Sequence, residues 1–568
     1  MSKYLSLDRE PPPNPSKGGE IEVRTEGLRG KAKDEKRKAK GEINTLPLAP
    51  SNLEGELITT TKSEKMKLPE AFISYTREMM GEKLFATFME GMRQTASVSV
   101  RLNPLKIRGG NIREEQTAEG IRAELTAEGI REEQNAEGIR EELEPERVPW
   151  CRHGYYLQGR PHFTFDPLLH AGCYYVQEAA SMFVDEVIRQ HVHGPVVALD
   201  LCAAPGGKST ALLAALPTGS VLVSNEPIRQ RAHILSENLQ KWGHADVLVT
   251  NNMPSDIRQT GVIFDLILTD VPCSGEGMFR KDAEAIGEWS AQHVLACQRL
   301  QRDIVEEAWQ CLRPGGLLIY STCTFNLHED EENILWAVET LGAEVLPVAT
   351  HEEWHVTPSL SELLKDCVCR FIPGITRGEG LFMAVLRKPE AADASLSLQK
   401  PQRKKEKHLR QREKNPKNDR ASASSIMAWL SHPELFTLRE NGDDISAIPT
   451  RWLSLYEQMS GLRILHAGVG MGNRRGKDLL PAQSLALSPH LNPAAFATCE
   501  IDHAQAMSYL RKEAVVLPHS IPRGFVLLTY RGVGLGFVKN IGSRANNLYP
   551  QEWKIRSGYQ PEGLCEIM

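Results

Sequence analysis

Short apolar runs alternate with helical segments between residues 190 and 388, and this alternation constrains the fold more than any other feature of the sequence. Continuous apolar runs are typical of strands that are buried on both faces. When helices separate such strands, the pattern predicts a parallel sheet covered by helices on both sides. We therefore predict an α/β domain over residues 190–388, whose strands are VVALDL, SVLVSN, DVLVT, FDLILTD, LLIYSTC and LFMAVLR.

The part of the chain before this domain divides into a polar tail and a compact subdomain. Residues 1–65 are rich in Pro, Gly, Lys and Glu, so we expect a disordered tail. Residues 66–189 contain two helical stretches and an alternating strand, which predict an α+β subdomain. A nonapeptide repeat inside it places Ile112, Ile121, Ile130 and Ile139 on alternating faces of a helix. Because no apolar stripe results, we expect a mobile insertion over about 108–146 rather than a stacked solenoid.

Two segments follow the α/β domain. Residues 389–425 are strongly basic and lack apolar periodicity, which predicts a linker. The linker is either a solvated spacer or a segment whose lysines and arginines contact phosphates nonspecifically. Residues 426–568 contain the strand-like GFVLLTY and GLGFVKNIG, which predict a smaller α+β module.

The composition narrows the class of protein. A hydrophobic content of 41% is ordinary for a globular chain, and a net charge of -6 gives no sign of a polyanionic partner, so any nucleic-acid binding must depend on local patches. The eleven cysteines are scattered, which argues against a disulfide framework and for a reducing compartment. There is no signal-peptide core and no uncharged apolar run of about 18 residues. We expect a cytoplasmic, monomeric protein that does not bind membranes.

The stretch LDLCAAPGGKST follows the first apolar strand and resembles a triphosphate-binding loop, except that Cys202 stands at the position of its first glycine. Pro205 removes one amide donor and fixes a dihedral angle in the middle of this loop, which disfavours a triphosphate. The second strand ends at Glu226, where a carboxylate can accept hydrogen bonds from both ribose hydroxyls. The pair of features predicts an adenosine-type cofactor.

Two cysteines close strands of the same sheet: Cys273 in TDVPCSGEGMFRK and Cys323 in YSTCTFN. Both should lie at the edge of the sheet where the cofactor binds. Neither has a Cys-x-x-Cys partner or a ligand histidine at zinc-finger spacing, so we expect no metal. Cys297 and Cys311, in a helical segment, are predicted to be core residues.

These three stretches resemble the RNA cytosine-C5 methyltransferases of the Fmu/Sun superfamily, most closely the bacterial ribosomal-RNA enzymes of the RsmF type. The similarity extends to SVRLNPLK, GCYYVQEAASM and NIGSRANNLYPQEWKI, and so covers most of the chain outside the tail, repeat and linker. It implies a Rossmann-like sheet that binds S-adenosylmethionine, an N-terminal subdomain that binds RNA and a C-terminal PUA-like module.

The resemblance also implies roles for individual residues. Cys323 would be the nucleophile, Cys273 would assist product release, and Asp270 would hold the nitrogen edge of the cytosine. Asn252 stands where many members of the family have aspartate, so we expect an altered contact to the adenine. The implied cofactor-binding residues are Cys202, Ala203, Ala204, Pro205, Gly206, Gly207, Lys208, Glu226, Asn252 and Asp270.

The implied substrate is a cytosine in RNA that must leave its helix to be reached. Ribosomal RNA is the first expectation and transfer RNA the second. Expected RNA contacts include the arginines and lysines of the segments 101–106, 152–160 and 280–281, and Tyr155, Tyr156, Tyr174 and Tyr175 would either stack on bases or pack in the core. The alternatives are a catalytically idle RNA-binding factor for ribosome assembly and a methyltransferase that acts on an exocyclic amine.

Overall fold

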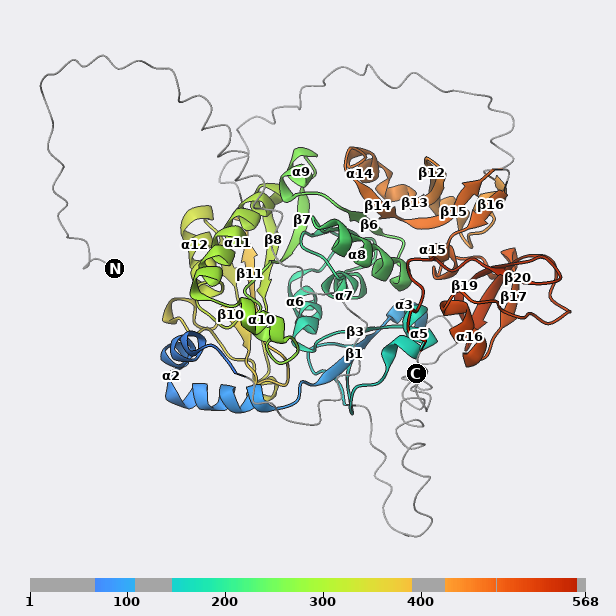
Figure 1. Cartoon of the computed structure of the whole chain (residues 1–568). Helices are drawn as coiled ribbons and strands as arrows, with labels where there is room; N and C mark the ends of the chain where they lie inside the picture. Colours follow the sequence, from blue (N-terminus) through green and yellow to red (C-terminus); the bar gives the residue numbers. More distant parts are fainter. Residues whose placement is uncertain (1–66, 108–145, 391–423, 477, 559–568) are drawn as a thin grey trace, which may run out of the picture. The chain divides into compact units, whose positions relative to one another are not determined.

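The computed structural model describes residues 67–107, 146–390, 424–476 and 478–558 (Figure 1). The predicted disordered tail over 1–65 lies outside the described residues, as do nearly all of the predicted insertion over 108–146 and linker over 389–425. No helix within the described ranges is long and apolar enough to cross a bilayer.

The largest sheet of the described residues confirms the predicted Rossmann-like α/β fold. It has nine strands, and its main order is β10-β11-β8-β7-β4-β5-β6-β14, with β9 paired to β11. All six predicted segments form strands in it, but LFMAVLR (β11, Leu381–Arg387) is antiparallel to its neighbours, so the expectation of a parallel sheet is wrong for this strand. The parallel strands are β4 (Val197–Asp200), β5 (Val221–Asn225), β6 (Val247–Thr250), β7 (Phe264–Asp270) and β8 (Leu312–Thr322). The antiparallel strands are β9 (Glu344–Leu346), β10 (Val368–Phe371), β11 (Leu381–Arg387) and β14 (Ile464–Ala467).

Two hydrophobic cores cover the two faces of this sheet. Successive residues of β4 point to opposite faces, with Ala198 in one core and Leu199 in the other. Helices α6 (Val184–His191), α7 (Gly207–Ala215) and α8 (Arg229–Trp242) contribute to the first core. Helices α9 (Pro254–Gln259), α11 (Ala291–Cys311) and α12 (Glu331–Leu341) contribute to the second, and the short α10 spans Ala283–Glu288.

The chain before the sheet forms a long helix and a small antiparallel sheet of order β2-β1-β3. Helix α2 has a non-helical residue at Gly81 (φ 72°), so the two predicted helices are the two halves of α2. Phe88 of α2 packs on Phe325, two residues after Cys323, at 5.0 Å between ring centroids. The elements are α2 (Glu70–Arg93), β1 (Val98–Leu102), α3 (Pro104–Ile107), β2 (Gly154–Leu157), α5 (Pro167–His170) and β3 (Tyr174–Val176).

The described C-terminal residues form two four-stranded sheets with short helices, in agreement with the predicted α+β module. Strand β14 instead leaves this part of the chain and pairs with β6 at the edge of the large sheet. The first small sheet contains β12 (Phe436–Asn441), β13 (Asp444–Pro449), β15 (Val469–Arg475) and β16 (Asp478–Pro481). The second contains β17 (Ala497–Glu500), β18 (Gly524–Tyr530), β19 (Val533–Asn540) and β20 (Ala545–Asn547). The helices are α14 (Leu453–Gln458), α15 (Gln483–Ala486) and α16 (His503–Leu510).

Candidate active site

The loop between β4 and α7 is built to present backbone rather than side chains. Cys202, Ala203 and Ala204 are buried, while Pro205 is exposed. Gly206 precedes α7 in a left-handed conformation (φ 116°) that favours glycine. Burial raises the pKa of the Cys202 thiol well above its usual value, so this cysteine stays neutral and packs as a core residue. The Ala203 amide is already used, since it donates to the Asn225 carbonyl at 2.9 Å, so a ligand at this loop would meet mainly the backbone at the start of α7.

Asp200, the last residue of β4, lies beneath the loop and is completely buried. Its Oδ2 accepts a hydrogen bond from the Ser209 hydroxyl at 2.6 Å, which ties the start of α7 to the strand. Its Oδ1 has no hydrogen-bond partner in the part of the chain that the structure describes. Burial raises the pKa of Asp200 to about 7, and the nearby carboxylates of Asp270 and Glu226 add to this effect.

The loops after β5 and β6 bring Glu226 and Asn252 to the same edge of the sheet. Oε1 of the buried Glu226 accepts from the Ile228 amide at 2.9 Å, and burial raises its pKa. The side-chain oxygen of Asn252 accepts from the Arg463 amide at 3.1 Å, just before β14. The C-terminal part of the chain thus supports the position predicted to lie near the adenine, a contact that no pattern in the sequence indicates.

Asp270 ends β7, and two polar partners hold its carboxylate. Nζ of Lys208 lies 2.8 Å from its Oδ1, and the Ser321 hydroxyl donates to the same oxygen at 2.6 Å. Burial alone would lower the pKa of Lys208, but the Asp270 carboxylate outweighs burial and raises it, with a further contribution from Cys323. Lys208 is therefore a cation within electrostatic range of both Asp270 and Cys323. The Asp270 side chain remains 34% exposed.

The thiols of the two predicted cysteines are in contact. Sγ of Cys273 lies 3.2 Å from Sγ of Cys323, and both residues are half-buried. The hydrogen bond between the thiols is the largest cause that raises the pKa of Cys273 well above its usual value, and burial adds to it. Cys273 therefore keeps its proton. Cys297 and Cys311 are buried in α11, as predicted.

Two buried carboxylates join the loops that bear these cysteines. Glu276 accepts hydrogen bonds from the amides of Phe325 (2.7 Å) and Asn326 (3.2 Å), just after Cys323. Glu329, which follows Cys323 in the chain, accepts from the amide of Ser274, the residue after Cys273, at 3.0 Å. The Gly277 amide also donates to the Cys323 carbonyl at 2.7 Å. The distance between the two sulfur atoms is therefore fixed from both loops.

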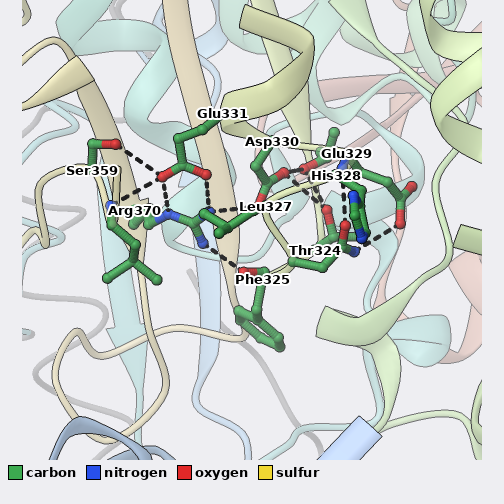
Figure 2. Close-up of polar contacts among 12 residues, drawn as sticks. Thr324, Phe325, Leu327, His328, Glu329, Asp330, Glu331, Ser359 and Arg370 are labelled. Atoms are coloured by element: carbon green, nitrogen blue, oxygen red, sulfur yellow. Dashed lines mark hydrogen bonds and ion pairs between the residues drawn. The ribbon is translucent and has the colours of Figure 1, made fainter. Parts of the chain in front are cut away.

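A second buried network holds the loop after Cys323 from the side of β10 (Figure 2). Arg370 donates from Nε to Glu331 at 2.8 Å and from a terminal nitrogen to the Phe325 carbonyl at 2.8 Å. Asp330 accepts from the hydroxyls of Thr322 (2.6 Å) and Thr324 (3.0 Å). Removal of one partner from such a network leaves an uncompensated buried charge, so the loop is held in one arrangement.

Several residues expected to contact RNA have structural roles instead. Arg101 is 1% exposed and donates to Gln177, Gly207 and Thr210. Nζ of Lys106 donates to the carbonyl of Lys241 at 2.6 Å. The Arg280 side chain is 7% exposed and forms an ion pair with Glu379, as Lys281 also does. Arg152 and Arg160 are exposed, whereas Tyr155, Tyr156 and Tyr174 are core residues and Tyr175 is half-buried.

Comparison with known protein families gives three matches along the chain. Residues 190–387 match the family of 16S rRNA methyltransferase RsmB/F. Residues 112–179 match the N-terminal domain of 16S rRNA methyltransferase RsmF, and residues 496–555 match the methyltransferase RsmF PUA domain.

Individual relatives match over most of their length. The ribosomal RNA small subunit methyltransferase F of Escherichia coli O9:H4 is 28% identical over 506 residues, which cover 86% of this chain and 97% of the relative. The protein of the same name from Citrobacter koseri is 29% identical over 508 residues, with the same coverage. Among solved structures, a methyltransferase homologue from Pyrococcus horikoshii is 26% identical, with a TM-score of 0.45 over 57% of this chain and 96% of that chain.

Proposed function

Since the chain belongs to the RsmB/F family of 16S rRNA methyltransferases, we propose that it transfers a methyl group from S-adenosylmethionine to carbon 5 of a cytosine in ribosomal RNA. The observation that supports this reaction most directly is the 3.2 Å contact between the sulfur atoms of Cys273 and Cys323. Methylation of an exocyclic amine would need no pair of thiols. A catalytically idle factor would need neither the thiols nor the buried carboxylate of Glu226.

The residues around the loop after β4 fit an adenosine-type cofactor. Oδ1 of Asp200 is a buried acceptor without a partner among the described residues, which indicates that a polar ligand group or water satisfies it. Glu226 would accept from the ribose hydroxyls. We assign the backbone of residues 202–208 to the cofactor as well, and the amide group of Asn252 to the adenine. When bound, S-adenosylmethionine supplies an electrophilic methyl group.

The thiol pair can make carbon 5 of cytosine reactive toward a methyl donor. Carbon 5 is a weak nucleophile, and addition of a thiolate to carbon 6 pushes electrons toward it. We assign this addition to Cys323, because the raised pKa of Cys273 keeps that neighbour protonated and able to donate to a thiolate. The Lys208 ammonium is placed to offset the negative charge at Cys323.

The reaction must end with release of Cys323. After carbon 5 has been methylated, a base removes the proton from this carbon, and the electron pair of that bond expels the Cys323 sulfur from carbon 6 as a thiolate. Cys273, in contact with the leaving sulfur, assists this step by donating to it. Asp270, fixed by Lys208 and Ser321, holds the nitrogen edge of the base and stabilises the charge that forms there.

The choice of RNA follows from the relatives and from the C-terminal module. The named relatives are ribosomal RNA small subunit methyltransferases, and the matching C-terminal residues belong to a PUA domain of that family. Ribosomal RNA of the small subunit is the proposed substrate, with transfer RNA as the second candidate.

A transfer assay with separate RNA pools tests this proposal. The full chain is incubated with methyl-labelled S-adenosylmethionine and either small ribosomal subunits, free 16S ribosomal RNA or transfer RNA, and the modified position is located by bisulfite sequencing. We expect label in 5-methylcytosine of ribosomal RNA. Label confined to transfer RNA would mean that transfer RNA is the substrate. Label in an exocyclic amine would refute methylation at carbon 5.

A further inference from the structure

We propose that Gln177 binds the cofactor, with its Nε2 amide donating a hydrogen bond to the carboxylate of the methionine part of S-adenosylmethionine. This inference rests on the proposed function. It assigns a residue of the N-terminal subdomain to the cofactor site.

The backbone of Gln177 is fixed at the end of β3. Its amide donates to the Ser99 carbonyl at 3.1 Å, and its own carbonyl accepts from the Ser99 hydroxyl at 2.5 Å. Ser99 belongs to β1, so the small antiparallel sheet sets the position from which the side chain of Gln177 starts.

Arg101 fixes the direction of the Gln177 amide. Nε of Arg101 donates to Oε1 of Gln177 at 2.8 Å. A guanidinium has only donors, so the oxygen of the amide must face Arg101 and Nε2 must point away from it. Arg101 is itself completely buried and donates to the hydroxyl of Thr210 at 2.5 Å, in the first turn of α7.

Nε2 of Gln177 is a buried donor that none of the described residues pairs with. The residue is 7% exposed, and Nε2 has no hydrogen-bond partner among the described residues. A buried donor that stays unpaired costs folding free energy, so such a group is normally satisfied by a ligand or water. A Cβ atom built on Gly207 would lie 3.7 Å from this Nε2, which places the free donor beside the first residue of α7.

The chemistry of that position points to an anionic group. Like any helix N-terminus, that of α7 presents backbone amide groups that have no partner within the helix, together with the positive end of the helix dipole, and its first turn contains no acidic residue. Glu226, the proposed ribose ligand, lies after the neighbouring strand β5. The carboxylate at the other end of the cofactor is the anion that suits a helix N-terminus and a neutral amide donor.

Binding of two ligands to the full chain tests the assignment. S-adenosylhomocysteine has the methionine-derived carboxylate, whereas 5′-methylthioadenosine keeps the adenosine and lacks that carboxylate. Gln177→Glu preserves the acceptor for Arg101 and removes the donor. By calorimetry it should weaken S-adenosylhomocysteine binding by about tenfold or more and leave methylthioadenosine binding within about twofold.

Further variants make the result independent of folding. Gln177→Met, without donor or added charge, should weaken only S-adenosylhomocysteine, by roughly fivefold to tenfold. Gln458→Glu, the same substitution outside the site, should change neither ligand. Unchanged affinities in both Gln177 variants, or equal losses for both ligands, would overturn the role of Gln177 and would leave the proposed cofactor unaffected. A wild-type chain that binds neither ligand would overturn both this inference and the proposed cofactor.

Discussion

The sulfur atoms of Cys273 and Cys323 lie 3.2 Å apart although 50 residues separate them in the chain. The register of the sheet explains this contact. Strands β7 and β8 are parallel neighbours in which Asp270 pairs with Ser321, and the cysteines follow this pair by three and two residues. Because both loops leave the same edge of the sheet, the two thiols meet beside Asp270.

The release role of Cys273 predicts a stalled complex. In Cys273→Ala, Cys323 can still add to carbon 6, but its departure loses the neighbouring donor. We expect turnover to fall by roughly a hundredfold and a covalent complex with ordinary RNA to accumulate on denaturing gels. Cys297→Ala, a buried cysteine in α11, is the control and should give no such complex. Full turnover of Cys273→Ala without a stalled species would show that the release role is wrong.

Glu329 is predicted to hold the thiol pair in place. Its carboxylate accepts from the amide and hydroxyl of Ser274, from Gln301 and from Asn326. Glu329→Gln turns an amide group toward these donors, so the free energy of unfolding should fall by about 1–3 kcal/mol.

The same variant should also form the covalent complex more slowly, measured by gel shift of labelled RNA. Glu306→Gln, at an exposed position of α11, serves as the control for the change of charge. Equal stability and equal rates in Glu329→Gln and wild type would contradict the positioning role.

The raised pKa of Asp200 predicts that the free energy of unfolding depends on pH. Its pKa is about 7 in the folded chain against the usual 3.8, mainly because of burial. A raised carboxyl pKa means that the folded state binds the proton more tightly, so this stabilisation is complete below about pH 4 and is lost as the pH rises through about 7.

Asp200→Asn cannot ionise and should not show this loss. The difference in unfolding free energy between the variant and wild type should grow by roughly 2–3 kcal/mol from about pH 5 to about pH 8, measured by urea unfolding. Asp303→Asn, at an exposed position of α11, should show a constant difference. A constant difference for Asp200→Asn as well would mean that its pKa is not raised.

The sequence predicted the residues at the ends of the strands well. Apolar runs identify β4, β5, β7 and β8, and the polar or sulfur-containing residues that follow such runs must gather at one edge of a parallel sheet. Asp270, Glu226 and the two cysteines were found in this way. Their mutual distances follow from strand order and register, which a single sequence does not determine.

The supporting residues were harder to predict. Residues 329–331 are three consecutive acidic residues, a pattern that is normally solvent-exposed, yet all three are buried by partners such as Gln301 and Arg370 that lie 28 and 39 residues away. Arg101 is likewise a charged residue, for which the sequence predicts a contact to RNA at the surface. Only its hydrogen bond from β1 to Thr210 of α7 shows that it is internal. Strand β14 joins the sheet at an open edge, and such pairing leaves no pattern in the sequence.

The covalent role of Cys323 is tested most directly by trapping it on a substrate analogue. RNA that contains 5-fluorocytosine has no proton at carbon 5 that a base can remove, so the covalent intermediate cannot resolve. With labelled S-adenosylmethionine and this RNA, we predict a stable protein–RNA adduct whose peptide map shows the modification at Cys323, and no adduct with Cys323→Ser. An adduct that persists in Cys323→Ser, or one that maps to Cys273 in the wild type, would contradict the proposed mechanism.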